Sequence, residues 1–275
     1  MSVRAGAGLA KDDAGVDSFA EAAARASLGL GGAPCGLALV VAGGPGASEL
    51  EEGARMVRER LRPRAMIGCG AQGVLAAGRE VEGGGVAVWA ASLGDGHAEP
   101  FRLEASPAGS GIALSGVPNL DQADAVLLLV DPYGFPVEPL LGYLREARPG
   151  VPVLGGLASA GPGAALVRDE DVRPGGAVGA VLRGVRVVPC VSQGARPVGP
   201  EMAITAGEGN VIHELASRPA LDRVRDAVAE LHPAEQALAA SGLLLGVVVD
   251  PNKPDYERGD FLIRGITGAD EESGS

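Results

Sequence analysis

The stretch VSQGARPVG, at residues 191–199, combines several polar side chains with two glycines. Ser192 offers a hydroxyl group, Gln193 an amide, and Arg196 a cation with five hydrogen-bond donors that suits a carboxylate or a phosphate. Gly199 helps to shape the loop around them. Mixed polar groups beside glycine are typical of sites that recognise a small polar molecule. The stretch predicts one wall of a ligand pocket, and a simple ion pair between Arg196 and an acidic side chain is the alternative.

Small residues also follow the return strands of two predicted βαβ units, in the runs GCGA (68–71) and GGLAS (155–159). Glycine there permits a tight turn or the close approach of a ligand to the backbone. We expect these two loops to complete the pocket. The candidate residues are Gly68, Cys69, Gly70, Gly155, Gly156 and Ser159.

The segment GDFLIRG, at 259–265, adds an acid and a base around an apolar centre. In a strand, Asp260, Leu262 and Arg264 lie on one face because side chains alternate. Asp260 and Arg264 are therefore candidates either for a structural ion pair or for part of the pocket.

The sequence favours binding over catalysis. It contains no G-x-S-x-G, H-E-x-x-H or G-x-x-x-x-G-K-[ST] motif. The three histidines, His97, His213 and His232, lie in separate segments, so a metal site would need distant segments to converge. A reactive Cys69 would need a nearby cation or helix N-terminus to lower its pKa, and the sequence shows neither. We therefore interpret Cys69 as a buried structural cysteine.

Composition excludes several classes of partner. The 275-residue chain has a formal net charge of −12, which disfavours nucleic acid and anionic lipid surfaces. Its three cysteines are widely spaced, as expected of reduced thiols in a cytoplasmic protein. The first thirty residues lack a signal-peptide pattern, and no apolar run approaches the ~20 residues that span a bilayer.

Hydrophobic patterns predict a βαβ unit twice. The apolar run 37–42 is followed by a helical stripe, at Leu50, Ala54, Val57 and Leu61, and by a return strand at 64–67. The same order recurs with a strand at 125–130, a helix opened by Pro136 and a return strand at 151–154. Each unit implies parallel pairing. We interpret the recurrence as an internal duplication, although βαβ units are common and look alike.

The other expected elements are mostly antiparallel strands and hairpins. They are strands at 86–91 and 101–103, a hairpin at 177–182 and 185–191 with its turn at Arg183 and Gly184, a hairpin at 202–205 and 211–215, strands at 243–249 and 261–266, and helices at 18–26, 220–231 and 233–240. Residues 1–11 are expected to be loose. The fold class is α/β, with a mixed β-sheet core, two βαβ units, antiparallel hairpins and flanking helices.

Several ordered motifs resemble the FIST family. They are GCGAQGV (68–74), VWAASL (88–93), ADAVLLLVDPYGFPVEPLL (123–141), PVLGGLAS (152–159), GAVGAVLRG (176–184), VSQGARPVGP (191–200), GEGNVIHEL (207–215) and GDFLIRGITGAD (259–270). The resemblance covers nearly the whole chain. It implies an N-terminal helical or flexible segment at 1–34, a sensory domain similar to FIST N at 35–232, and the start of a domain similar to FIST C at 233–275, which is cut short.

The resemblance implies a sensory function. FIST proteins are regarded as intracellular sensory domains that bind small ligands, amino acids among them, and act beside signalling modules. The expected protein is therefore a non-enzymatic, bacterial-type sensor that binds a small polar ligand near Arg196 and signals through a separate protein. We expect no cofactor, and haem, which some members bind, is an alternative. A scaffold that engages a partner through its C-terminal strands and a thiol enzyme acting through Cys69 are further alternatives.

Overall fold

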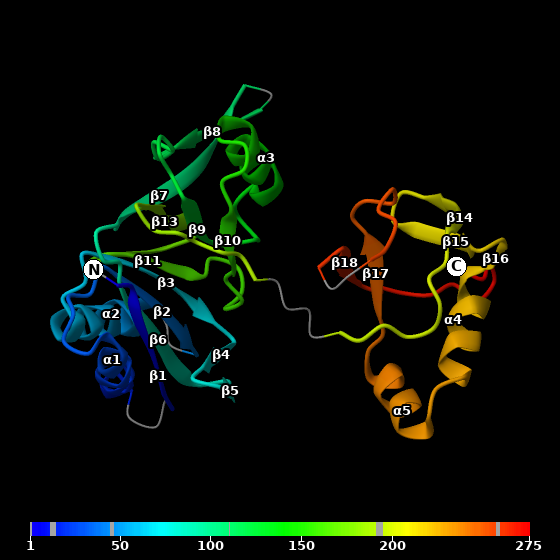
Figure 1. The fold of residues 1–275 in the computed structure, drawn as a ribbon, viewed down its shortest axis with the longest axis horizontal. Coiled ribbons are helices and arrows are strands. Elements are labelled where there is room, and N and C mark those ends of the chain that lie inside the picture. The colour runs from blue at the N-terminus through cyan, green and yellow to red at the C-terminus, as the bar shows by residue number, and fades with distance from the viewer. Residues whose placement is uncertain (1, 12–14, 45–46, 110, 191–194, 257–258) are drawn as a thin grey trace. The chain divides into compact units, whose positions relative to one another are not determined.

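The computed structural model describes residues 2–11, 15–44, 47–109, 111–190, 195–256 and 259–275. The chain forms two compact units, one ending at Pro189 and the other beginning at Cys190 (Figure 1). This division falls at neither of the predicted domain boundaries, 34/35 and 232/233. The assignment of family domains to those ranges remains a prediction.

The first unit contains two large β-sheets. The six-stranded sheet has the order β1 (Arg4–Ala10), β6 (Gly85–Ser92), β2 (Leu37–Gly43), β3 (Ala65–Ala71), β11 (Ala165–Arg168) and β12 (Asp171–Pro174). The five-stranded sheet has the order β10 (Val153–Leu157), β9 (Ala125–Val130), β13 (Ala177–Arg183), β7 (His97–Ala108) and β8 (Gly111–Ser115). A separate hairpin consists of β4 (Gly73–Ala76) and β5 (Arg79–Glu82).

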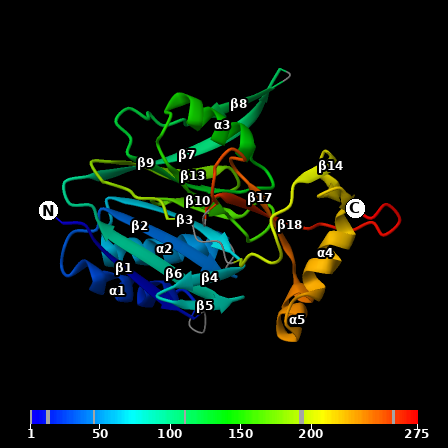
Figure 2. The same ribbon diagram turned by 45° about the vertical axis from the view of Figure 1, so that its right-hand side comes forward.

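The first unit has four layers, with the sheets inside and the helices outside (Figures 1 and 2). Helices α1 (Asp17–Leu30) and α2 (Ala47–Leu61) cover the six-stranded sheet, and their core contains Phe19, Val57 and Met66. Helix α3 (Val137–Ala147) covers the five-stranded sheet through Leu140 and Leu144. A third apolar cluster joins the two sheets. The predicted fold class, α/β with a mixed sheet core, is confirmed.

A buried charge also joins the two sheets. Arg102 in β7 donates to the carbonyl oxygen of Leu166 in β11, at 2.8 Å. Its Nε lies 3.2 Å from a carboxylate oxygen of Asp171 in β12, and only 5% of the Arg102 side chain is exposed. Burial lowers the pKa of Arg102, and Asp171 opposes that change. The guanidinium therefore fixes the β11–β12 hairpin against the other sheet.

Both predicted βαβ units are present, and the repeat extends beyond them. Strands β2 and β3 pair in parallel, as do β9 and β10. Each unit is followed by a hairpin, β4–β5 or β11–β12, and then by a strand, β6 or β13, which pairs antiparallel with the first strand of its unit. Strand β1 beside β6 corresponds to β7 beside β13. The topology supports the duplication interpretation.

Gly68 and Gly155 occupy equivalent positions in the two repeats. Gly68 in β3 lies opposite Val40, and a Cβ on Gly68 would lie 2.4 Å from the Val40 carbonyl oxygen. Gly155 in β10 lies opposite Leu128, and a Cβ there would lie 1.7 Å from the Leu128 carbonyl oxygen. Real Cβ atoms do not approach so closely, so both positions require glycine.

The expectation of a loose N-terminus is wrong. Residues 4–10 form β1 and pair with β6 along their whole length. Two glycines explain the difference, because they let α1 pack directly on the strand. A Cβ on Gly6 would lie 2.1 Å from the Ala26 carbonyl oxygen, and one on Gly8 would lie 2.0 Å from that of Ala22.

The predicted hairpin turn at Arg183 and Gly184 is also wrong. Residues 185–190 form no strand, and residue 191 lies outside the described residues. Strand β13 pairs with β9 on one side and with β7 on the other. Both of its edges are therefore occupied, and no edge is available to the segment that follows.

The helix ends and faces of the first unit follow local packing. Helix α1 has Val16 as its N-cap without a side-chain cap, and the Ser18 hydroxyl donates to the Lys11 carbonyl oxygen at 2.7 Å. In α3, Leu140 and Leu144 are buried, whereas Leu141 is exposed.

The second unit contains short sheets and two helices. Its elements are β14 (Ile204–Glu208), β15 (Val211–Leu215), β16 (Arg218–Pro219), α4 (Ala220–Ala229), α5 (Pro233–Ser241), β17 (Leu244–Val248) and β18 (Phe261–Gly265). Strands β14 to β16 form one antiparallel sheet, and β17 pairs antiparallel with β18. The predicted hairpin, helices and C-terminal strands of this region are confirmed.

Candidate ligand site

The first predicted glycine loop is part of a strand. Gly68, Cys69 and Gly70 are buried inside β3, between β2 and β11. Cys69 lies opposite Leu166 of β11, so this edge of β3 is already paired. These residues are therefore part of the sheet core, and the glycines are needed for close packing of strands.

The second predicted loop divides between a strand and a turn. Gly155 and Gly156 belong to β10 and are exposed, whereas Ser159 lies just beyond the strand and is also exposed. Leu157, at the end of β10, is 58% exposed. Unlike β3, β10 presents its glycines to solvent.

The carboxyl ends of β3 and β10 meet. The Gln72 backbone N–H donates to the Ser159 hydroxyl oxygen at 3.1 Å. A Cβ on Gly70 would lie 3.3 Å from the Cβ of Ala160. The ends of the two return strands are thus adjacent, through the pairs Gln72–Ser159 and Gly70–Ala160. That these stretches line a ligand pocket stays a prediction.

Asp131 holds this region in place, and sequence reasoning missed it. It follows β9 directly and is only 2% exposed. Its carboxylate accepts the backbone N–H groups of Tyr133, at 3.0 Å, and of Gly163, at 3.2 Å. The signal was a charged residue after the apolar run AVLLLV. Because Asp131 binds two loops, we assign it a positioning role.

The cysteines have the environment of structural thiols. Burial raises the pKa of Cys69 to about 11. Burial also raises the pKa of Cys35, although hydrogen bonds to the backbone at Ala91 and Leu37 oppose the change. A nucleophilic cysteine needs a lowered pKa. The environment of Cys69 is therefore the opposite of what a thiol enzyme requires.

Arg196 belongs to the second unit and forms an ion pair. Its guanidinium donates to the Glu235 carboxylate at 2.5 Å, with 67% of the Arg196 side chain exposed. That hydrogen bond raises the pKa of Arg196 and lowers the pKa of Glu235. Glu235 also accepts the His232 backbone N–H in the capping box of α5. This is the ion-pair alternative that the sequence left open.

The other predicted residues of the second unit have separate partners. Gly199 has a φ of +70°, and a Cβ there would lie 2.9 Å from that of Ala227 in α4. Asp260 accepts from the Lys253 ammonium at 2.6 Å. Arg264 donates instead to the Ile263 carbonyl oxygen, at 3.1 Å.

Two predicted pocket residues, Ser192 and Gln193, lie outside the described residues. Their place in a ligand site stays a prediction.

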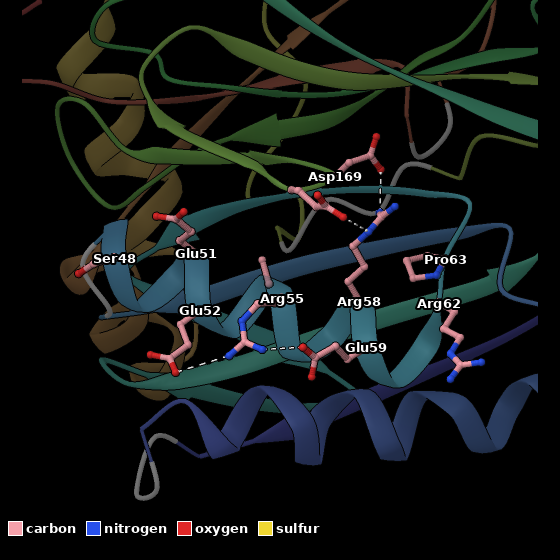
Figure 3. A pocket seen from close by; sticks show the side chains of 11 residues that line it. Ser48, Glu51, Glu52, Arg55, Arg58, Glu59, Arg62, Pro63 and Asp169 are labelled. Carbon is pink, nitrogen blue, oxygen red and sulfur yellow. Dashed lines mark hydrogen bonds and ion pairs between the residues drawn. The ribbon is translucent and has the colours of Figure 1, made fainter.

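A charged hollow lies along α2 (Figure 3). Arg55 pairs with Glu59 at 2.5 Å, and Arg58 pairs with Asp169 at 3.4 Å and with Glu170 at 3.1 Å. These carboxylates neutralise the two arginines, which leaves little attraction for an anionic ligand. Through Arg58 the network instead holds the β11–β12 turn against α2. Asp169 also ties this turn to β3, because it accepts the Met66 backbone N–H at 3.0 Å.

Within the described part of the chain, no group of three His, Cys, Asp or Glu side chains is placed to hold a metal ion. None of the helices there is both long and apolar enough to cross a membrane.

Comparison with known proteins identifies the family. The FIST N domain model matches residues 36–218. An uncharacterized protein of Mycobacterium tuberculosis strain H37Rv is 40% identical over 262 residues, which cover 93% of this chain and 68% of that protein. An uncharacterized protein of Mycobacterium bovis is 38% identical over 279 residues, covering 99% and 72% respectively. No solved structure matches the chain. FIST domains are generally sensory or signalling domains, and this chain belongs to the FIST family.

Proposed function

We propose that this chain is a non-catalytic cytoplasmic sensor that binds a small polar ligand at the meeting point of the β3 and β10 ends. The observation that carries the proposal is the contact between Gln72 and Ser159, which brings the ends of two βαβ units together. In α/β proteins, ligands bind in crevices outside the carboxyl ends of parallel strands. Both strand pairs here are parallel.

The exposed groups suit a carboxylate or an amide, such as those of an amino acid. The Ser159 hydroxyl oxygen accepts from Gln72, and its own proton can be donated to a ligand oxygen. Gly156 has no side chain to obstruct the backbone, and no heavy atom lies within 4 Å of where its Cβ would be. A ligand can therefore approach the chain closely at this point.

Thermal shift with amino acids, small carboxylates and nucleotides tests the proposal. A ligand present at one hundred times its Kd stabilises the folded chain by about 2.7 kcal/mol. Ser159→Ala should reduce the shift, and Ser106→Ala, on another exposed serine in β7, should leave it unchanged. The site assignment fails if no ligand shifts the wild-type midpoint or if Ser159→Ala responds like the wild type.

Arg196 is a separate candidate for the ligand carboxylate. If the ligand binds Arg196 in place of Glu235, the thermal shift should disappear in Arg196→Ala and persist in Ser159→Ala. The two variants therefore distinguish the two assignments. An ultraviolet–visible spectrum of the purified protein tests haem, which would add a strong Soret band.

A scaffold is the second candidate function. The sheet formed by β17 and β18 exposes apolar side chains, with Leu244 51% and Leu262 45% exposed. Such side chains favour contact with a partner, which we propose to be a separate signalling protein. Replacing both leucines by serine should abolish capture of that partner and leave ligand shifts intact.

A further inference from the structure

The two repeats differ at one edge of their sheets. Strand β3 is covered on its outer edge by β11, whereas β10 ends the five-stranded sheet and pairs only with β9 among the described residues. The β11–β12 hairpin occupies two positions in the first sheet that have no counterpart in the second. Within the described residues, the outer edge of β10 is therefore unpaired, whereas the equivalent edge of β3 is paired with β11.

The hydrogen-bond pattern defines which groups of β10 are available. The Val126 N–H of β9 donates to the Pro152 carbonyl oxygen, and the Ala158 N–H donates to the Val130 carbonyl oxygen of β9. The even-numbered residues from 152 to 158 therefore bond to β9. Because backbone groups alternate along a parallel strand, those of Val153, Gly155 and Leu157 point away from β9. They form three successive donor and acceptor pairs on the open edge.

The β10 edge lacks the features that protect sheet edges. Natural edge strands carry charges or proline, which oppose pairing with another chain. Strand β12, at an edge of the other sheet, contains Asp171, Arg173 and Pro174. Strand β10 has the sequence VLGGL, without a charge or a proline.

We propose that β10 pairs antiparallel with β10 of a second copy of this chain, and that the protein is a symmetric dimer through this edge. The equivalent edge of β3 pairs antiparallel with β11, so the repeat accepts this geometry. Centred on Gly155, the pairing places Val153 opposite Leu157 of the partner subunit. An apolar side chain thus covers the exposed Leu157, and the uncharged strands do not repel each other.

Strand addition would also cover the exposed Gly155. Gly155 would lie opposite Gly155 of the partner subunit, where neither strand has a side chain to separate the backbones. In the first repeat the equivalent Gly68 lies opposite Val167 and is buried. The proposal concerns assembly and does not depend on the proposed ligand function.

Light scattering after size exclusion, over a range of protein concentrations, tests the dimer. The molar mass measured for the wild type should approach twice the chain mass of 27.4 kDa as the protein concentration rises. Leu157→Pro removes only the N–H that faces the open edge and should remain at 27.4 kDa, whereas Leu157→Val should dimerise. A wild-type monomer at all concentrations, or a dimer unaffected by the proline, would overturn the proposal.

A crosslink keeps the test decisive if Leu157→Pro does not fold. In a Cys190→Ser background, the double variant Val153→Cys and Leu157→Cys should form disulfide-linked dimers on mild oxidation. Opposed residues in a hydrogen-bonded antiparallel pair lie about 5.5 Å apart, within the range of disulfides. Each single variant should stay uncrosslinked, because its cysteine faces an apolar residue of the partner. Absence of a dimer in the double variant would refute the register.

Discussion

The thiol of Cys69 is expected to resist alkylation in the folded chain, which would remove the thiol-enzyme alternative. Its pKa of about 11 is two units above the ordinary value of 9.0. At neutral pH the thiolate fraction is therefore about 100-fold lower than that of an ordinary thiol. Burial in β3 adds steric protection, since only 5% of the residue is exposed.

Iodoacetamide labelling followed by peptide mass spectrometry measures this difference. Cys190 is exposed and serves as the internal reference within the same chain. We expect Cys190 to be labelled at neutral pH while Cys69 stays unmodified, and both to be labelled in guanidinium. Labelling of Cys69 at the rate of Cys190 in the folded protein would refute the burial argument.

The same pKa predicts a loss of stability at alkaline pH. The folded chain holds the proton of Cys69 more tightly than the unfolded chain, so the stabilisation is complete below about pH 9 and is lost as the pH rises toward 11. A difference of two units corresponds to about 2.7 kcal/mol. Cys69→Ala should lose this contribution to the pH dependence. An identical alkaline profile in the variant would contradict the assigned pKa.

Three further predictions concern stability. Leu140→Ala should lower the free energy of unfolding by about 3 kcal/mol in urea denaturation, because Leu140 is fully buried on the inner face of α3. Asp171→Ala should cost about 3 kcal/mol, because it leaves Arg102 buried without its counter-charge, and adding Arg102→Met should restore part of the loss. Arg196→Ala should leave the thermal midpoint unchanged in the absence of ligand, because its ion pair with Glu235 is exposed.

Short-range patterns predicted most of the fold. Continuous apolar runs located β2 and β9, since strands buried on both faces need such runs. The helical stripe of α2 was correct at all four positions, from Leu50 to Leu61. These signals depend on the residues of one segment, and the sequence contains them directly.

Glycine was the main source of error. We interpreted Gly68 and Gly70 as loop residues and the glycines of residues 1–11 as a loose end. In the structure they lie in β3 and β1. A glycine that turns the chain and a glycine that admits a neighbouring backbone look the same in one sequence. Only the partner distinguishes them, and for Gly6 the partner is Ala26, twenty positions away.

The candidate site was only partly predictable for a similar reason. The expectation that the two glycine-rich stretches share one site rested on treating the two βαβ units as equivalent, and the structure places Gln72 against Ser159 and Gly70 against Ala160. Asp131 was missed because a carboxylate after a strand has many roles, and its role depends on Gly163, which is distant in the sequence. Arg196 carried the strongest chemical signal, yet its acidic partner Glu235 could not be chosen among 35 acidic residues.

The two equivalent glycines share a steric requirement but differ in exposure. Gly68 and Gly155 have the same steric requirement, so alanine at either should destabilise its sheet. Only Gly155 is exposed, because β11 covers the edge beside Gly68 and no described strand covers the edge beside Gly155. Two copies of one structural unit have thus reached different environments at the same position. The second repeat is the one whose backbone a ligand or another chain can reach, and for that reason both proposals concern β10 or the turn that follows it.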